Sequence, residues 1–217
     1  MNKLLLLLSF CSLQLAAAQQ ELVRFPSGAA SWTVECQQKG KSASAGQSAN
    51  TQDENAPILQ RIEIAQTDAA RRSILQWSNG RKQELWSLPK LSLLVAEDPL
   101  GKAFVTKNAA MFGDPFSPAD FGWIKPGSRV GDETVKIGNT ECYHYKGVIV
   151  MPSLPGDKSP VTIPCEAWIN SETSQPVALL KGETLGKFTF GAAPESLEMP
   201  EKFLKRLNYH KMTMGMR

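Results

Sequence analysis

The sequence predicts a mainly β protein with antiparallel strands, and two local patterns carry that prediction. Residues 58–66 alternate between apolar and charged side chains, the period of two that is typical of a half-buried strand; the apolar positions are Ile58, Ile62 and Ile64. Residues 71–77 and 81–88 flank Ser-Asn-Gly, and Asn-Gly between two such runs indicates a type I′ hairpin turn. Short strands joined by tight turns pair antiparallel.

The expected strands follow one another along most of the chain. They cover residues 31–35, 58–66, 71–77, 81–88, 91–97, 133–151, 161–169, 176–180 and 187–190. The type I′ turn would place Leu75, Trp77 and Trp86 on one face. The alternation in 161–169 aligns a second face, formed by Val161, Ile163, Cys165, Ala167 and Ile169. Asp98-Pro99 closes the fifth run, after which a strand and a short helix towards Met111 are both open.

The C-terminal segment from Pro200 to Met212 is short and basic. Its apolar residues recur at helical spacing, which predicts a terminal helix that docks this stripe on the rest of the protein; they are Phe203, Leu204 and Leu207. The alternative is contact with an anionic membrane surface or partner through the surrounding basic residues, which are Lys202, Lys205, Arg206 and Lys211.

Two segments are expected to be loops of opposite kinds. Residues 39–57 consist almost wholly of Gly, Ala, Ser, Asn, Gln and charged residues, which predicts a flexible loop. Residues 113–131 carry three prolines and four glycines between large apolar side chains. We therefore expect an ordered loop whose apolar side chains pack over another part of the protein. We interpret its aromatic residues as the lid of an apolar pocket, with a plain hydrophobic plug as the alternative; they are Phe112, Phe116, Phe121 and Trp123.

The first eighteen residues have the features of a secretory signal peptide. Lys3 precedes an apolar run from Leu4 to Leu8, and small residues end the segment at Ala18. We therefore expect residues 1–18 to be a leader, residues 19–217 to form one β-rich domain, and the protein to be exported to the periplasm or beyond the cell. Phe10 stands where a lipoprotein signal needs a small residue before Cys11, which argues against lipidation there.

Composition and spacing argue against several classes of function. The sequence has 24 Lys and Arg against 21 Asp and Glu, and both signs are scattered along the chain. It therefore lacks the clustered basic residues that are typical of a nucleic-acid-binding surface. The only histidines are His144 and His210, and no Cys-x-x-Cys occurs, so neither a metal nor another cofactor is expected. The part of the sequence after the leader has no apolar stretch long enough for a membrane helix.

Three cysteines follow the leader. An oxidising compartment would allow one disulfide and leave one thiol. We favour Cys142 with Cys165, because both lie in strand-like runs of one expected hairpin. Pairs through Cys36, and three buried reduced thiols, are the alternatives.

The run Trp168-Ile169-Asn170-Ser171-Glu172-Thr173-Ser174-Gln175-Pro176-Val177 has the pattern of a turn between two strands. Asn170 and Thr173 can hydrogen-bond the turn backbone, and Pro176 can start the return strand. This run resembles the turn of the outer-membrane lipoprotein carriers and their sorting relatives, and the resemblance extends loosely over residues 58–203. It implies a strongly curved antiparallel half-barrel, with short helices or loops over a concave face that holds lipid acyl chains or an apolar partner segment. No functional residue is carried over from that family.

No catalytic motif is found. Cys142 and His144 share a strand face, but neighbours on one face lie about 6–7 Å apart, which is long for an activated thiol. Carboxylates are spread over different strands and are interpreted as solvated; they are Glu35, Glu63, Glu84, Glu97, Asp98, Glu141 and Glu166. The chain is therefore interpreted as a non-enzymatic, soluble binding or carrier module for an apolar ligand, lipid or lipidated partner.

Two alternatives come from other classes. One is a non-catalytic interaction subunit of a cell-envelope complex, which a filled concave face would favour. The other is a secreted carboxylate-dependent hydrolase, which two carboxylates about 5–10 Å apart in an open cleft would favour. An open apolar cavity near Trp123 would favour the carrier.

Overall fold

The computed structural model describes residues 22–39, 57–98, 100–107, 115–151 and 160–215. The expected leader at 1–18, nearly all of the expected loop at 39–57, and Phe112 lie outside the described residues. Within these ranges no helix is both long and apolar enough to cross a membrane.

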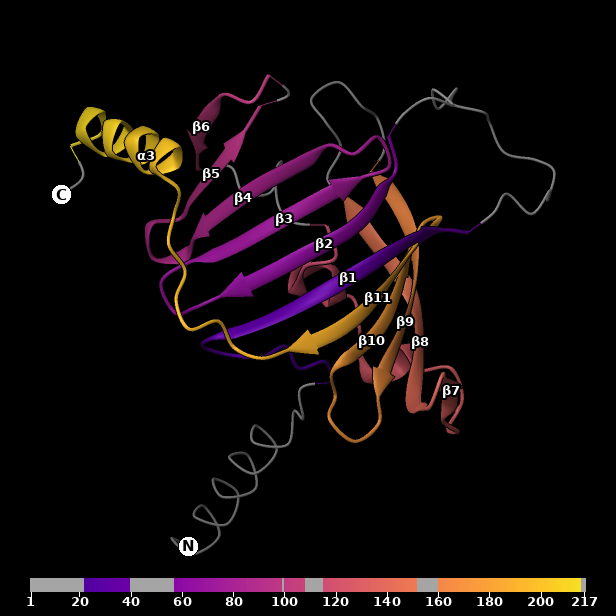
Figure 1. Ribbon diagram of the computed structural model, residues 1–217. Helices are drawn as coiled ribbons and strands as arrows, with labels where there is room; N and C mark the ends of the chain where they lie inside the picture. The colour runs from indigo at the N-terminus through magenta and orange to yellow at the C-terminus, as the bar shows by residue number, and fades with distance from the viewer. Residues whose placement is uncertain (1–21, 40–56, 99, 108–114, 152–159, 216–217) are drawn as a thin grey trace, which may run out of the picture.

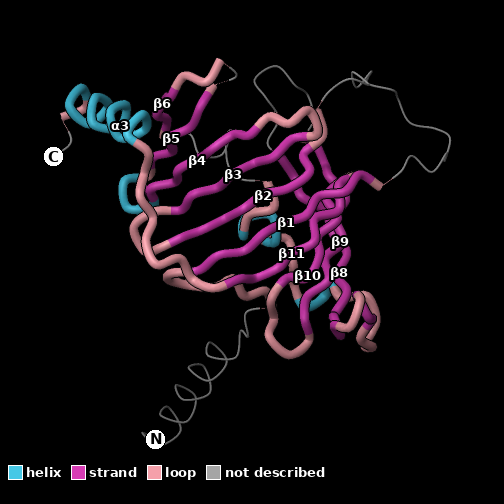
Figure 2. Tube along the Cα trace, viewed as in Figure 1, coloured by secondary structure: helices cyan, strands magenta, loops and turns pink. Residues whose placement is uncertain are grey.

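Eleven antiparallel strands of the described chain form one unclosed sheet, which confirms the predicted fold class (Figures 1 and 2). The order is β6-β5-β4-β3-β2-β1-β11-β10-β9-β8-β7. The strands are β1 (Ala30–Gln38), β2 (Leu59–Gln66), β3 (Arg71–Trp77), β4 (Lys82–Leu88), β5 (Leu93–Glu97), β6 (Ala103–Thr106), β7 (Val135–Ile137), β8 (Thr140–Met151), β9 (Val161–Asn170), β10 (Pro176–Lys181) and β11 (Thr184–Gly191). The sheet bends so that β8 and β9 turn away from the plane of β2 to β4 (Figure 1).

The helical elements in the described residues are short. Three are 3-10 turns, and the fourth is an α-helix near the C-terminus. They are η1 (Pro89–Leu91), η2 (Pro118–Phe121), η3 (Pro126–Ser128) and α3 (Glu201–Thr213). For the segment after Asp98 the sequence allows either a strand or a short helix. The structure has strand β6 there.

Every second side chain of a strand points to the inner face of the sheet, where the main core lies. On β1 the inner residues are Trp32, Val34 and Cys36, and all three are buried. The expected alternation is confirmed in β2 and in β9, where the central positions are buried. The first apolar residue of each pattern is exposed to solvent instead of buried: Ile58 is 39% exposed and Val161 is 55% exposed.

The hairpin between β3 and β4 forms where expected, but its turn type and register differ. Gly80 has a φ of 80° whereas Asn79 does not have positive φ, and the Gly80 N–H donates to the Trp77 carbonyl at 2.9 Å. The loop is therefore a type I turn followed by a left-handed glycine, one residue longer than a type I′ loop. A shift of one residue reverses the faces, so Leu75 points inward while Trp86 lies in the cluster on the outer face. The prediction that Leu75 and Trp86 share a face is wrong.

Helix α3 packs against the outer face of β5 and β6. Phe203 is fully buried there and Leu207 is 6% exposed, in a cluster with Trp86 and Val95. This confirms the predicted docking of the terminal helix. Leu204 does not join the buried stripe, because it is 41% exposed.

The turn between β9 and β10 has the backbone contacts expected from its sequence. Asn170 Oδ1 accepts the N–H groups of Glu172 and Thr173 at 2.8 and 3.0 Å. Thr173 Oγ1 accepts the N–H of Gln175, and β10 begins at Pro176. The side chains of the motif therefore hold the turn, as the sequence predicts.

Candidate functional site

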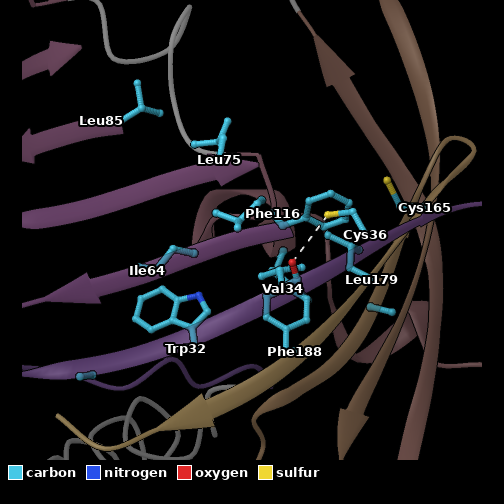
Figure 3. Close-up of a cluster of buried hydrophobic side chains, with 14 of the residues drawn as sticks. Trp32, Val34, Cys36, Ile64, Leu75, Leu85, Phe116, Cys165, Leu179 and Phe188 are labelled. Atoms are coloured by element: carbon cyan, nitrogen blue, oxygen red, sulfur yellow. Dashed lines mark hydrogen bonds between the residues drawn. The ribbon is translucent and has the colours of Figure 1, made fainter. Parts of the chain in front are cut away.

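The aromatic residues of the expected lid meet on the inner face of the sheet. Phe116 and Phe121 are 3% and 4% exposed, and Trp123 is half-buried against the same core cluster. We call Phe116, Phe121 and Trp123 the aromatic plug. Phe116 reaches from its loop to the side chains of Val34 and Leu179 (Figure 3). The plug therefore brings together three of the four lid residues that the sequence predicts.

Two strand glycines make room for the plug. A Cβ atom on Gly147 of β8 would lie 2.4 Å from Cε3 of Trp123, and one on Gly186 of β11 would lie 2.7 Å from the Phe116 ring. No side chain other than hydrogen fits at such distances. Each of these two aromatic rings thus rests on bare strand backbone, in direct contact with the sheet. Glycine inside a strand often marks such a close approach, and this signal was available in the sequence.

Polar contacts also hold the plug in place. Ser117 and Asp120 form a capping box at the start of η2, in which the Ser117 N–H donates to Asp120 Oδ2 at 3.1 Å. The other carboxylate oxygen accepts a hydrogen bond from Lys181 Nζ of β10 at 2.6 Å. The Asp120 and Lys181 side chains are only 12% and 26% exposed. The plug is therefore tied to a strand by a largely buried ion pair, which no local pattern in the sequence indicates.

Aromatic packing continues from the plug towards the N-terminal segment. The Phe25 ring lies 5.3 Å from that of Phe121 and 5.8 Å from that of Trp32, measured between centroids. Phe121 also lies edge-on to Phe188 at 5.7 Å. Such tilted and edge-to-face pairs are the favoured arrangement of aromatic rings. Phe25 was missed because a lone aromatic before the first strand gives no periodic signal.

The plug and the tryptophans of the core beside it have two energetically unfavourable features. Phe116 has a φ of 61°, the left-handed region that is strained for a bulky residue. The indole N–H groups of Trp32, Trp77 and Trp123 are buried without an acceptor among the described residues. A buried donor without a partner costs free energy.

A separate groove lies on the outer face, over β11, β1, β2 and β3. It has a volume of about 430 Å³ and is open to solvent. Its wall includes the hydroxyls of Thr33 and Thr189, the charged groups of Arg61 and Arg72, and apolar surface from Ile74. The groove thus offers mixed polar, charged and apolar contacts on the side of the sheet opposite the plug.

Ion pairs organise the charges of this groove. Arg61 donates to Glu35 at 2.8 Å and lies 3.1 Å from a carboxylate oxygen of Glu63. Arg72 Nε donates to Glu84 Oε1 at 2.8 Å. The two glutamates that share Arg61 are 48% and 40% exposed. These carboxylates are therefore arranged as cross-strand ion pairs around guanidinium groups.

The other carboxylates singled out in the sequence have partners elsewhere. Glu97 pairs with Lys202, and Glu166 pairs with His144 and Lys146. Glu141 accepts from the Thr134 hydroxyl at 3.4 Å, and Asp98 accepts two backbone N–H groups of its own turn. In the described part of the chain, no group of three or more metal-binding side chains is placed to hold a metal ion.

The predicted Cys142–Cys165 disulfide is wrong for this fold. The two strands do pair, but Cys165 lies opposite Gly147, five residues along β8 from Cys142. That separation corresponds to about 17 Å along a strand, far beyond the reach of a disulfide, whose Cα atoms lie within about 7 Å. Cys36, Cys142 and Cys165 are buried free thiols.

The expected weakness of the Cys142 and His144 pair agrees with the contacts observed. The Cys142 thiol donates to its neighbouring Thr140 carbonyl at 3.6 Å, and burial raises its pKa. His144 Nε2 contacts Glu166 Oε2 at 2.8 Å, and the imidazole stacks on Trp168 at 5.0 Å. The histidine therefore has its own partners, and the thiol lacks the lowered pKa of an activated nucleophile.

We expect these thiols to resist alkylation in the folded protein. Burial raises the pKa of the Cys36 thiol to about 12, so the reactive thiolate is scarce at pH 8. Intact mass after iodoacetamide treatment at pH 8 should show all three cysteines unmodified in the native state. All three should be modified in denaturant without reductant, whereas any disulfide would leave two of them protected.

Comparison of the chain with protein-family models and with curated proteins finds no match.

Proposed function

We propose that the chain is an exported, non-catalytic interaction subunit of a cell-envelope complex, which binds its partner on the outer face of the sheet. The observation that carries this proposal is the seating of Trp123 on Gly147 and of Phe116 on Gly186. These contacts fill the inner face with the chain's own side chains. A half-barrel built to carry a ligand would use that space for cargo.

The outer groove suits a protein partner better than a lipid. Charged and hydroxyl side chains line it beside apolar surface of similar extent, whereas pockets for apolar ligands are lined mainly by apolar side chains. Arg61 and Arg72 are 41% and 39% exposed, so they can exchange their glutamate partners for carboxylates of another chain. The partner segment is expected to carry at least one acidic and one apolar side chain.

Site-specific photocrosslinking in the exported compartment tests this proposal. A photoreactive residue at Thr33 or Thr189, in the groove, should give one discrete adduct. The same residue at Lys90, which is exposed and lies outside the groove, is the control. The double variant R61E/R72E should abolish the adduct. Equal adducts from Lys90, or an adduct that survives the charge reversal, would contradict the proposal.

A carrier for an apolar ligand, the function that the family resemblance implies, is the second candidate. Its support is the strained φ of Phe116 and the unpaired indole donors of Trp32 and Trp77. A ligand with an acceptor group would relieve both features if it displaced the plug.

Mass spectrometry of organic extracts distinguishes the two candidates. The interaction subunit should purify without a stoichiometric small molecule. A carrier should release one lipid or apolar molecule per chain, and the variant F121A/W123A should lose it. The result depends on the inner face alone, so it is independent of the crosslinking experiment on the groove.

A further inference from the structure

Helix α3 has one buried side and is held firmly by it. Phe203 and Leu207 insert into the outer cluster of β4 and β5, and Lys202 forms an ion pair with Glu97 of β5. The opposite side of α3 is turned away from the sheet (Figure 1). The orientation of the exposed side is therefore fixed by the fold.

That exposed side carries large apolar residues. Leu204 is 41%, Tyr209 59% and Met212 79% exposed, and Met214 just beyond the helix is 51% exposed. At 100° per residue, Leu204 and Tyr209 lie about 140° apart around the helix axis, with Met212 and Lys205 between them. The exposed side therefore interleaves apolar and basic side chains. A lipid interface can take up both, the apolar groups among the acyl chains and the basic groups at the phosphates.

The helix also carries an excess of basic residues. Between residues 201 and 213 there are four basic residues and one acidic residue, Glu201. Glu201 is already paired with Lys205 at 2.8 Å across one helical turn. Arg206 and Lys211 flank the apolar residues. Helices that combine basic residues with exposed Leu, aromatic or Met side chains bind anionic lipid surfaces through both interactions.

We propose that α3 docks the protein on an anionic lipid surface. Leu204, Tyr209 and Met212 enter the interfacial region, and Lys205, Arg206 and Lys211 contact the phosphate headgroups. This site lies on different strands from the groove proposed above and does not depend on it.

Vesicle co-sedimentation of the purified chain without its leader tests the proposal. The protein should sediment with vesicles of phosphatidylcholine and phosphatidylglycerol, and about tenfold less with phosphatidylcholine alone, since each basic residue near the surface contributes to binding. High salt should weaken the binding because it screens the charges. The variant L204S/M212S, which changes exposed residues only, should also lower it about tenfold.

The matched control is K125E/K136E, which changes two exposed lysines beside β8 and in β7, at the opposite edge of the sheet from α3, against K205E/K211E in the helix. The helix variant should lose binding, and the control should keep it. Melting temperatures close to that of the parent protein would show that α3 remains docked. Equal loss in both charge variants would overturn the proposal, since it would indicate attraction to net charge alone. Absence of sedimentation with anionic vesicles, while an immobilised poly-glutamate peptide retains the protein, would overturn it in favour of an acidic protein partner.

Discussion

Substitution of Gly147 by alanine is expected to destabilise the protein by about 2–3 kcal/mol, which is within the usual cost of overpacking a core. The added methyl group would lie 2.4 Å from Cε3 and 2.9 Å from Cζ3 of Trp123. Because β8 is paired to β9 along its length, the strand cannot shift away from the added methyl group. The Trp123 indole therefore has to move from its position on residue 147. Urea unfolding followed by far-ultraviolet circular dichroism measures the loss.

A double-mutant cycle with W123A separates this clash from any general effect on the strand. Without the indole, alanine at 147 should be neutral or slightly stabilising, since glycine weakens a strand. Gly127 is a matched control, because nothing lies within 4 Å of its added Cβ; G127A should change the free energy of unfolding by less than about 0.5 kcal/mol. If G147A is equally costly with and without Trp123, the plug does not rest on this glycine.

The plug shows which features can be predicted from residues that are close together in the sequence. Phe116, Phe121 and Trp123 belong to one loop rich in proline and glycine, so the sequence groups them, and they pack in or against one core cluster. Their contacts were not predicted, because Gly147, Lys181 and Gly186 come from strands far along the chain. The pairing of β1 with β11 joins residues more than 140 positions apart, and no periodic pattern specifies such a pairing. The outer groove, which spans that junction, was missed for the same reason.

Register was the other quantity that the sequence left undetermined. Alternation identified β2 and β9 as strands, and the Asn-Gly turn identified β3 and β4, but a two-residue and a three-residue loop around Asn79-Gly80 fit the same sequence. The difference of one residue moved Trp86 to the outer face, where it now supports α3. The disulfide prediction failed in the same way, because being in one hairpin does not place Cys142 and Cys165 opposite each other.

The plug contacts three different strands, at Gly147 of β8, Gly186 of β11 and Lys181 of β10. A lid that opens for cargo would be expected to have few such contacts, because the loss of each adds to the free energy of opening. The number of strands involved favours a permanent plug and hence an interaction subunit.

Lys181→Met is expected to destabilise the protein by about 2–3 kcal/mol, somewhat less than the loss of one partner in a fully buried ion pair. Methionine keeps most of the volume of the side chain but leaves the Asp120 carboxylate, 12% exposed, without its cation. The carboxylate still accepts the Ser117 N–H, so the capping box survives and the missing charge is the main change. Urea unfolding gives the loss, and hydrogen exchange of residues 116–124 shows whether the plug loosens first.

The variant K181M/D120N tests the cause, because it removes both charges while an amide oxygen at 120 can still accept the Ser117 N–H. It should recover at least half of the lost stability. K205M removes the lysine from an ion pair whose side chains are 74% and 79% exposed, so it should cost less than about 0.5 kcal/mol. Equal losses from K181M and K205M would mean that the ion pair does not hold the plug. A large loss from K181M with unchanged exchange in 116–124 would show that Lys181 stabilises β10 rather than the plug, and the case for a permanently closed inner face would then rest on the two glycines alone.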